Sequence, residues 1–332
     1  MAAGYEVGIR VGICAGVTHS TSGYHVTGTV GAVAAAAAAA QLMRLPPLQA
    51  AHALGIGATQ AAGLYAARMG AMTKRFHAGR ASQSGVLAAY LAGQGFTGSL
   101  DAIEAPFGGF MSTLRGERDA ASILTDLGER WETSYVGLKA YAACASAHTT
   151  IDGVLELRSR RLNADDLARL TIRVSKKSLI NIGWSYSPGE VITAQMNGSY
   201  AAAVALLDGE AFVGQYDERR LSDPAILALI SRIEFVHDPE LDRAGASKRH
   251  AVKIEAVRKD GNVMSTMVEQ RRGSADHPLS VTEIEQKFSR LARISLAPSA
   301  IDNLIGLVSE LEHQADLNRL SALIVASPLR PG

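Results

Sequence analysis

The chain contains 332 residues, of which 47% are hydrophobic and 20% charged, and its formal net charge is +1. This balance is typical of a folded globular protein and excludes a disordered chain. The longest apolar run, from Gly31 to Ala40, is much shorter than the roughly 20 residues of a membrane-spanning helix, so no membrane partner is expected. Two cysteines cannot build a disulfide framework and the N-terminal sequence lacks a signal-peptide pattern, which together predict a cytoplasmic protein.

The charged residues are distributed unevenly along the chain. No acidic residue occurs between Glu6 and Asp101, whereas this segment carries the basic residues Arg10, Arg44, Arg68, Lys74, Arg75 and Arg80. Such an excess of positive charge indicates an anionic partner. The cations are sparse and separated by alanine-rich sequence, unlike a nucleic-acid-binding stripe, so the expected ligand is a small carboxylate or phosphate and not a nucleic acid. Alternatively, these cations pair with acids from elsewhere in the fold.

The first elements along the chain are predicted to be helices. Strong helix formers run from Thr29 to Met43 and from Pro47 to Met69, where Gly70 provides a stop, and residues 78–93 have the same character. Small residues on these helices allow their backbones to approach closely. We therefore expect a helical core in the first part of the chain.

After Trp131 the pattern changes to a mixture of strands and helices. Residues 170–178 alternate in polarity like a strand, and the segment around the Asp260-Gly261 pair predicts two strands joined by a tight turn. From Ser280, which can form a capping box with Glu283, the chain becomes helical again. These elements predict a mainly α protein with an α+β second domain, in which the last helices rejoin the first domain.

Neither a nucleotide site nor a metal site is predicted in the basic segment. The sequence TGTVGAVAAA places glycines before a helix, but no strand leads into it and its spacing is not that of a nucleotide-binding loop. The histidines of this part lack the spacing of zinc ligands, and the acid-free segment offers no carboxylate ligand. We therefore expect no cofactor.

Two segments carry candidate catalytic groups. His25 lies in a glycine-bounded turn before the alanine-rich helix, where the helix N-terminus would favour a neutral imidazole that acts as a base. A histidine hydrogen-bonded within the turn is the alternative. The segment MTKRFHAGR gathers Lys74, Arg75, His77 and Arg80, an arrangement suited to binding carboxylates, whereas a solvated surface turn is the alternative.

Further along, Cys144 and His148 are four residues apart and would share one face of a helix. A cysteine nucleophile activated by His148 would need a third, orienting residue that the sequence does not show, so an inert buried cysteine is the alternative. Tyr200, in MNGSYAAAVALLDG, is typical of a core residue when it is considered alone. Local sequence therefore gives these residues no definite role.

Several segments occur in an order that is typical of one enzyme family. They are GYEVGIRVG, GYHVTGTVGAVAAAAAAAQLMRL, MTKRFHAGRASQSGVLAAYLAGQGFTG, LKAYAACASAHTTID and SYAAAVALLDG. This order resembles the MmgE/PrpD family, whose known members include 2-methylcitrate dehydratase, cis-aconitate decarboxylase and iminodisuccinate epimerase. The resemblance implies a homodimer, with a large all-helical domain of residues 1–134 and 278–332 and a smaller α/β lid domain of residues 135–277.

The same resemblance implies a site between the two domains that uses no metal or organic cofactor. Its implied catalytic residues are His25, Lys74, Lys139 and Tyr200, and its implied substrate-binding residues are Thr73, His77, Arg80, Cys144 and His148. The implied ligand is a small di- or tricarboxylate.

The implied activity is that of a cofactor-independent lyase. Dehydration of a 2-methylcitrate-like hydroxy acid by a hydro-lyase reaction, with removal of a proton beside a carboxylate, is the first hypothesis, and decarboxylation and epimerisation stay open. Family members carry roughly a hundred residues before the segment GYEVGIRVG, so apolar surface is expected to be uncovered in this chain. A truncated, non-catalytic remnant that binds carboxylates is therefore the competing hypothesis.

Overall fold

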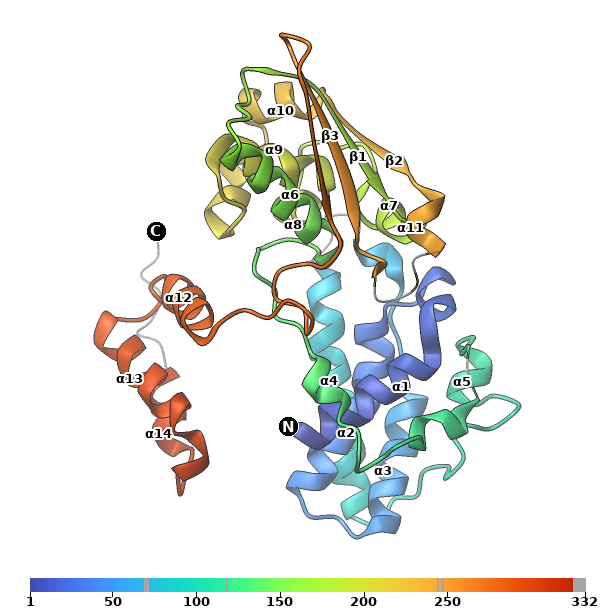
Figure 1. The fold of residues 1–332 in the computed structure, drawn as a ribbon. Coiled ribbons are helices and arrows are strands. Elements are labelled where there is room, and N and C mark those ends of the chain that lie inside the picture. Colours follow the sequence, from blue (N-terminus) through green and yellow to red (C-terminus); the bar gives the residue numbers. More distant parts are fainter. Residues whose placement is uncertain (69–71, 118, 244, 246–247, 325–332) are drawn as a thin grey trace.

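The computed structural model describes residues 1–68, 72–117, 119–243, 245 and 248–324. Figure 1 shows a lower part made of helices, an upper part that contains a β-sheet, and a group of C-terminal helices to one side. Helices dominate, and the sheet has four strands. The predicted fold class, mainly α with an α+β part, is confirmed.

The lower part is built around one alanine-rich helix. Helix α2 (Val26–Leu42) packs against α1 (Ala2–Thr21), α3 (Pro47–Thr59) and α4 (Thr73–Gly93). Glycines allow the close packing: a Cβ at Gly8 of α1 would lie 2.6 Å from the Ala34 Cβ. The expected close approach of small residues therefore holds, and α1 adds a helix that the sequence pattern did not predict.

Two predicted helix boundaries were wrong. The helix expected over 47–69 ends at Thr59, because a loop that contains Gly63, with φ of 144°, precedes the short 3-10 helix η1 (Tyr65–Arg68). The helix expected over 78–93 begins already at Thr73 as α4. Gly70, the expected stop, lies outside the described residues. As a result, Lys74 and His77 occupy the first two turns of α4 rather than a connecting turn.

One of the basic residues in the acid-free segment is neutralised inside the helical part. The Arg10 Nε donates to the Glu6 Oε1 at 2.7 Å, and both side chains are buried. The Arg10 guanidinium also donates to the carbonyls of Thr125 and Arg130. Burial opposes ionisation of Glu6, but Arg10 and the backbone N–H groups of residues 132 and 133 lower its pKa to about 2. For Arg10, the alternative of structural ion pairing therefore holds.

The segment between the helical part and the sheet contains only short helices. They are α5 (Phe110–Thr113), η2 (Ala120–Leu124), η3 (Glu132–Tyr135) and η4 (Ala145–Ala147). The segment packs on α1 through η2 and η3. Lys139 lies between η3 and η4, at the boundary with the sheet-containing part.

The upper part contains a mixed sheet with the strand order β2-β1-β3-β4. Strand β1 (Leu167–Val174) pairs in parallel with β2 (Ile233–His237), whereas β3 (Val252–Arg258) pairs antiparallel with β1 and with β4 (Val263–Val268). The hairpin predicted around Asp260-Gly261 is confirmed. The strand predicted over 170–178 ends at Val174, because the Ser175 side chain caps a helix, α7 (Lys176–Ile182). Strand β2 was not predicted.

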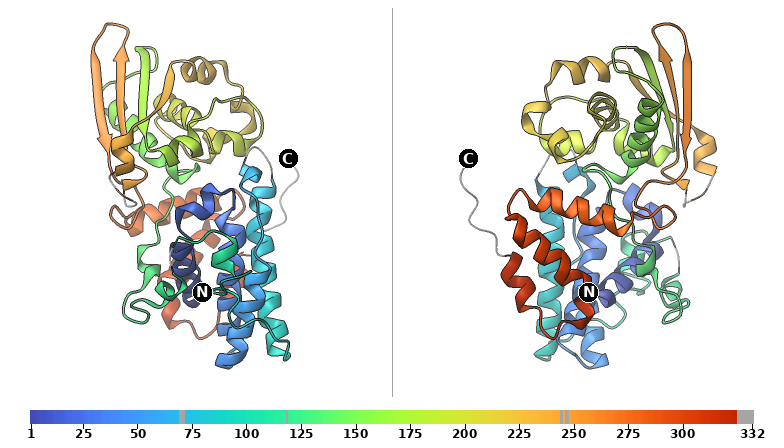
Figure 2. Two further views of the ribbon diagram at one scale, coloured as in Figure 1. Left: turned by 90° about the vertical axis from the view of Figure 1, so that its right-hand side faces the viewer. Right: turned by 60° about the vertical axis from the view of Figure 1, so that its left-hand side comes forward.

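Helices gather on one face of the sheet, as Figure 2 shows. Helices α6 (His148–Ser159) and α9 (Gly198–Asp208) pack against each other and on the strands, and their apolar residues form a core with β1 and β3. The remaining helices of this part are α8 (Val191–Gln195), η5 (Val213–Tyr216), η6 (Glu218–Arg220), α10 (Pro224–Ile230) and α11 (Pro239–Arg243).

The C-terminal helices are α12 (Val281–Ala292), α13 (Pro298–Ser309), η8 (Leu311–His313) and α14 (Asn318–Ile324). The predicted capping box of Ser280 and Glu283 is confirmed at the start of α12. Helix α12 contacts the sheet-containing part through an ion pair between Arg290 and Glu210 at 2.6 Å. In Figure 1, α13 and α14 stand apart from α1–α4. The assignment of residues 278–332 to the helical domain stays a prediction.

None of the helices in the described ranges is long and apolar enough to cross a bilayer. Apolar side chains are nevertheless exposed on α4, where Phe76, Val86 and Tyr90 are each more than half accessible. The homodimer and the cytoplasmic location stay predictions.

Candidate active site

His25 is held where two separate loops pair with each other. It precedes α2, and its backbone N–H donates to the Gly63 carbonyl at 3.1 Å, while the Tyr65 N–H donates to the Gly23 carbonyl at 2.7 Å. A Cβ at Gly28, in the first turn of α2, would collide with the Ala62 carbonyl oxygen. Glycine is therefore required at position 28 for the loop to come this close.

The pairing of these loops brings His25 against His77 of α4. The two Nδ1 atoms are 2.8 Å apart, so one ring donates the single proton between them and the other accepts it. Burial, followed by the charge of Lys74 and by His77, lowers the pKa of His25 to about 4. His25 is therefore neutral near pH 7, as the sequence indicated. The main cause is burial beside a cation rather than the expected helix N-terminus.

Lys74 of α4 and Lys139 of the segment before η4 lie close enough to act on each other electrostatically. Burial lowers the pKa of Lys74, and Lys139 and Arg75 lower it further against the opposing influence of Cys144. Lys139 donates from Nζ to the Ala143 carbonyl at 3.0 Å. Among the described residues, neither ammonium has a carboxylate partner. Lys74 is half-buried and Lys139 is exposed, and two neighbouring cations without a carboxylate partner among the described residues can bind an anion.

Hydrogen bonds of Gln195 and Asn181 join the sheet-containing part to the Cys144 segment and to the helical part. The Gln195 carbonyl accepts from the Cys144 N–H at 2.8 Å, and the Gln195 side chain accepts from Arg75 at 3.1 Å. On another side, Tyr65 donates to Asn181 at 3.0 Å. Sequence reasoning missed Gln195 and Asn181, because isolated amides in a lid segment carry no recognisable pattern. Their hydrogen bonds hold α8 against α4 and α7 against η1.

His148 lies directly behind Lys139, at the start of α6. The residue is fully buried, and neither ring nitrogen has a hydrogen-bond partner among the described residues. Burial, followed by the charges of Lys139 and Arg271, lowers its pKa to about 3. The expectation that Cys144 and His148 share a helical face was wrong, because Cys144 precedes the 3-10 turn η4 and α6 begins only at His148.

The buried, neutral state of His148 predicts acid sensitivity. The pKa falls from 6.5 to about 3 on folding, so the unfolded chain binds more protons in this window and stability decreases as the pH falls. Urea unfolding measures the free energy of unfolding at pH 7 and at pH 5. Between these pH values it should decrease by about 2 kcal/mol more in wild type than in His148→Gln. His313→Gln, which alters an exposed histidine, should behave like wild type. Equal pH dependence of wild type and His148→Gln would contradict this prediction.

Tyr200 lies one layer behind the lysines, inside the core of the lid. It is fully buried, and its hydroxyl donates to the Gln215 carbonyl at 2.8 Å. Its ring centroid is 5.5 Å from that of Tyr216, whose buried hydroxyl has no partner among the described residues. Burial raises the pKa of Tyr216, and Tyr200 and Cys144 raise it further. Tyr216, which sequence reasoning missed, therefore lies between Tyr200 and the cysteine.

The structure does not bring Arg80 to this cluster. Its guanidinium donates to Gln83 at 2.7 Å and borders a groove of about 430 Å³ between α3 and α4. Thr73 is exposed at the first position of α4 and makes no side-chain hydrogen bond among the described residues. The residues that do meet are His25, His77, Lys74, Lys139, Cys144 and His148.

Comparison with known proteins matches two domains of one family to most of this chain. The MmgE/PrpD N-terminal domain matches residues 1–122, and the MmgE/PrpD C-terminal domain matches residues 141–313. The chain belongs to the MmgE/PrpD family. The division between the two matches falls in the segment that carries Lys139, at the boundary where the cations meet.

Curated proteins similar to this MmgE/PrpD chain are named as cis-aconitate decarboxylases or as decarboxylase-like. A cis-aconitate decarboxylase-like protein of Aspergillus oryzae is 29% identical over 336 residues, which cover 97% of this chain and 69% of that protein. A cis-aconitate decarboxylase of Aspergillus terreus is 29% identical over 346 residues, covering 98% and 70%. The human cis-aconitate decarboxylase is 27% identical over 312 residues, covering 91% and 63%.

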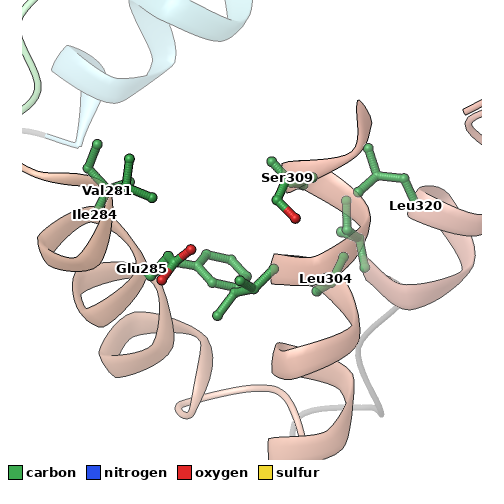
Figure 3. Close-up of a pocket in the computed structure, with 10 residues that line it drawn as sticks. Val281, Ile284, Glu285, Leu304, Ser309 and Leu320 are labelled. Atoms are coloured by element: carbon green, nitrogen blue, oxygen red, sulfur yellow. The ribbon is translucent and has the colours of Figure 1, made fainter. Parts of the chain in front are cut away.

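A cavity elsewhere in this MmgE/PrpD protein has the wrong chemistry for a carboxylate. It measures about 380 Å³ and lies among α12, α13 and α14, where Val281, Ile284, Leu304 and Leu320 line it (Figure 3). Glu285 adds a negative charge at its wall. In addition, no group of three or more side chains suited to hold a metal ion occurs in the described ranges. The cluster around Lys74 is therefore the better candidate for the active site.

Proposed function

We propose that this MmgE/PrpD protein is a lyase that acts on a small tricarboxylate, and that it releases carbon dioxide from cis-aconitate. The observation that carries the proposal is the pair Lys74 and Lys139, two cations without carboxylate partners in the part of the chain that the structure describes, beside the neutral His25. The similarity to proteins named as cis-aconitate decarboxylases or decarboxylase-like supports decarboxylation. Dehydration, the first hypothesis from sequence, has less support because the Tyr200 hydroxyl expected to assist it donates to Gln215.

The lysines stabilise the negative charge that develops during the reaction. When the bond to the departing carboxylate breaks, its electron pair spreads through the adjoining double bond toward a retained carboxylate. Cations fixed beside that carboxylate stabilise the developing charge more than they stabilise the substrate. Binding of the anion also offsets the repulsion that Lys139 exerts on Lys74, which favours the charged form of Lys74.

His25 supplies the proton that completes the reaction. Loss of carbon dioxide leaves an electron pair on carbon, and one proton must be added there. Because the two Nδ1 atoms share one proton, His25 carries its own proton on Nε2 whenever His77 donates through Nδ1. This tautomer makes His25 a general acid, and the opposite tautomer makes it a general base. His77 thereby positions the proton without touching the substrate.

The direct test is to incubate the chain with cis-aconitate, 2-methylcitrate, citrate and iminodisuccinate in separate reactions. We expect one carbon dioxide for each cis-aconitate consumed, measured by gas release and by chromatography of the remaining cis-aconitate. Alkene formation from 2-methylcitrate alone would replace decarboxylation with dehydration. Binding of these acids without any product would support the carboxylate-binding remnant. Neither binding nor product with all four acids would refute the proposal.

A further inference from the structure

A second group of cations lies on the lid, near the end of α1. Lys177 of α7, Arg249 before β3 and Arg271 after β4 are the members of this group, and we call it the lid cation cluster. None of the three has an ion pair with a carboxylate among the described residues. Glu117 lies near Lys177, but its carboxylate accepts from the N–H and hydroxyl of Thr18, both at 2.5 Å.

The backbone that carries Arg249 and His250 is fixed by the starts of two helices. The hydroxyls of Ser175 and Ser178 donate to the Arg249 carbonyl at 2.8 and 3.1 Å. The Thr149 hydroxyl donates to the His250 carbonyl at 2.5 Å. The backbone of this turn is therefore fixed to the folded lid, although the Arg249 side chain is exposed.

The protonation of His250 leaves a buried donor without an acceptor. Arg249 Nε donates to His250 Nε2 at 3.2 Å, so in the neutral ring Nδ1 carries the proton. Nδ1 is buried and has no hydrogen-bond partner among the described residues. A buried N–H group of this kind costs stability until an oxygen accepts from it. The unmatched donor is an observation independent of the surrounding charges.

The charges that act on His250 are all positive. Burial lowers the pKa of Arg271, and Arg249 lowers it further. Burial together with Arg249, Arg271 and Lys177 lowers the pKa of His250 to about 3. At position 137 a Cβ would lie 2.7 Å from the Arg271 Nη2, so glycine makes room for the guanidinium. An oxyanion would remove the repulsion and accept from His250 at the same time.

We propose that Lys177, Arg249, Arg271 and the Nδ1–H group of His250 form a second oxyanion-binding site, which holds a carboxylate or phosphate group. The charges of Lys139 from the lysine pair and of Arg271 from this site both act on His148. Two sources supply such an oxyanion: a remote carboxylate of a bound tricarboxylate, or a free inorganic anion. Binding at this site does not require turnover, so the inference stands independently of the lyase activity.

Calorimetric titration tests the site with inorganic phosphate, tricarballylate and glutarate as probes. We expect Arg271→Gln to weaken phosphate binding at least about tenfold, the effect of losing one charge-assisted hydrogen bond. Arg219→Gln removes the same charge from an exposed arginine that pairs with Asp217 and should bind phosphate like wild type. Arg271→Lys, which keeps the charge, should fall between them. Equal phosphate binding by Arg271→Gln, Arg219→Gln and wild type overturns the proposal, as does no binding by wild type.

The three probes also identify the source of the oxyanion. If the site holds a remote substrate carboxylate, Arg271→Gln weakens tricarballylate but not glutarate, and phosphate competes with tricarballylate. If it holds a free anion, phosphate still binds when tricarballylate is saturating. Nuclear magnetic resonance of wild type gives a readout that needs no mutant to fold, with His250→Gln used only for assignment. Phosphate should raise the pKa of His250, and an unchanged titration at saturation contradicts the proposed site.

Discussion

Replacing His25 with asparagine is expected to lower kcat/KM for cis-aconitate by about 10²- to 10⁴-fold, the range contributed by a positioned general acid or base. The imidazole has the two properties that this role requires. It is neutral near pH 7, because burial and Lys74 lower its pKa to about 4, and its tautomer is coupled to that of His77 through the 2.8 Å contact. Asparagine keeps a polar group at the site but cannot transfer a proton. Steady-state carbon dioxide release measures the loss.

A histidine outside the cluster provides the matched control for this substitution. His52 of α3 contacts the Gly98 carbonyl at 2.9 Å through Nδ1, and His52→Asn should leave kcat/KM close to that of wild type. Thermal unfolding of both variants establishes that each is folded at the assay temperature. Near-normal turnover by folded His25→Asn would assign the proton transfer to another group and remove the His25–His77 pair from the mechanism.

The parts of the fold that sequence predicts well are those determined by local pattern. Helix α2, the β3–β4 hairpin and the capping box at Ser280 each depend on neighbouring residues, and all three are present. The end of α3 and the start of α4 depend instead on the loop around Gly63, which pairs with residues 23–25 far away in the sequence. Helix propensity alone cannot reveal such a pairing, so the predicted boundaries failed there.

The candidate site also contains some residues that local sequence predicts and others that it does not. His25, His77 and Lys74 lie in motifs whose residue types already indicate anion chemistry, and the structure brings them together. Gln195 acts through its backbone carbonyl and through an amide that reaches another domain, which no spacing rule predicts. The burial of Tyr200 behind Tyr216 follows from packing inside the lid, where composition marks a tyrosine only as a core residue.

Replacing Lys74 with methionine is expected to lower kcat/KM by about 10²- to 10³-fold, the usual cost of removing one group that stabilises transition-state charge. Methionine fills a similar volume without the ammonium. The same substitution should leave the melting temperature unchanged or raise it, because Lys74 is desolvated, is repelled by Lys139 and Arg75, and has no carboxylate partner among the described residues. Carbon dioxide release and calorimetric unfolding, performed on one preparation, measure the two effects together.

The combination of lost activity and retained stability is what separates a functional cation from a structural one. Lys259→Met, at the exposed β3–β4 turn, removes the same charge and should change neither quantity. Lys74→Arg keeps the charge on a larger, planar group and should recover part of kcat/KM. If Lys74→Met is instead strongly destabilised while the folded fraction turns over normally, the ammonium serves the fold. The lysine pair would then cease to be the anion site, because a desolvated cation that stabilises the empty protein must already have a partner.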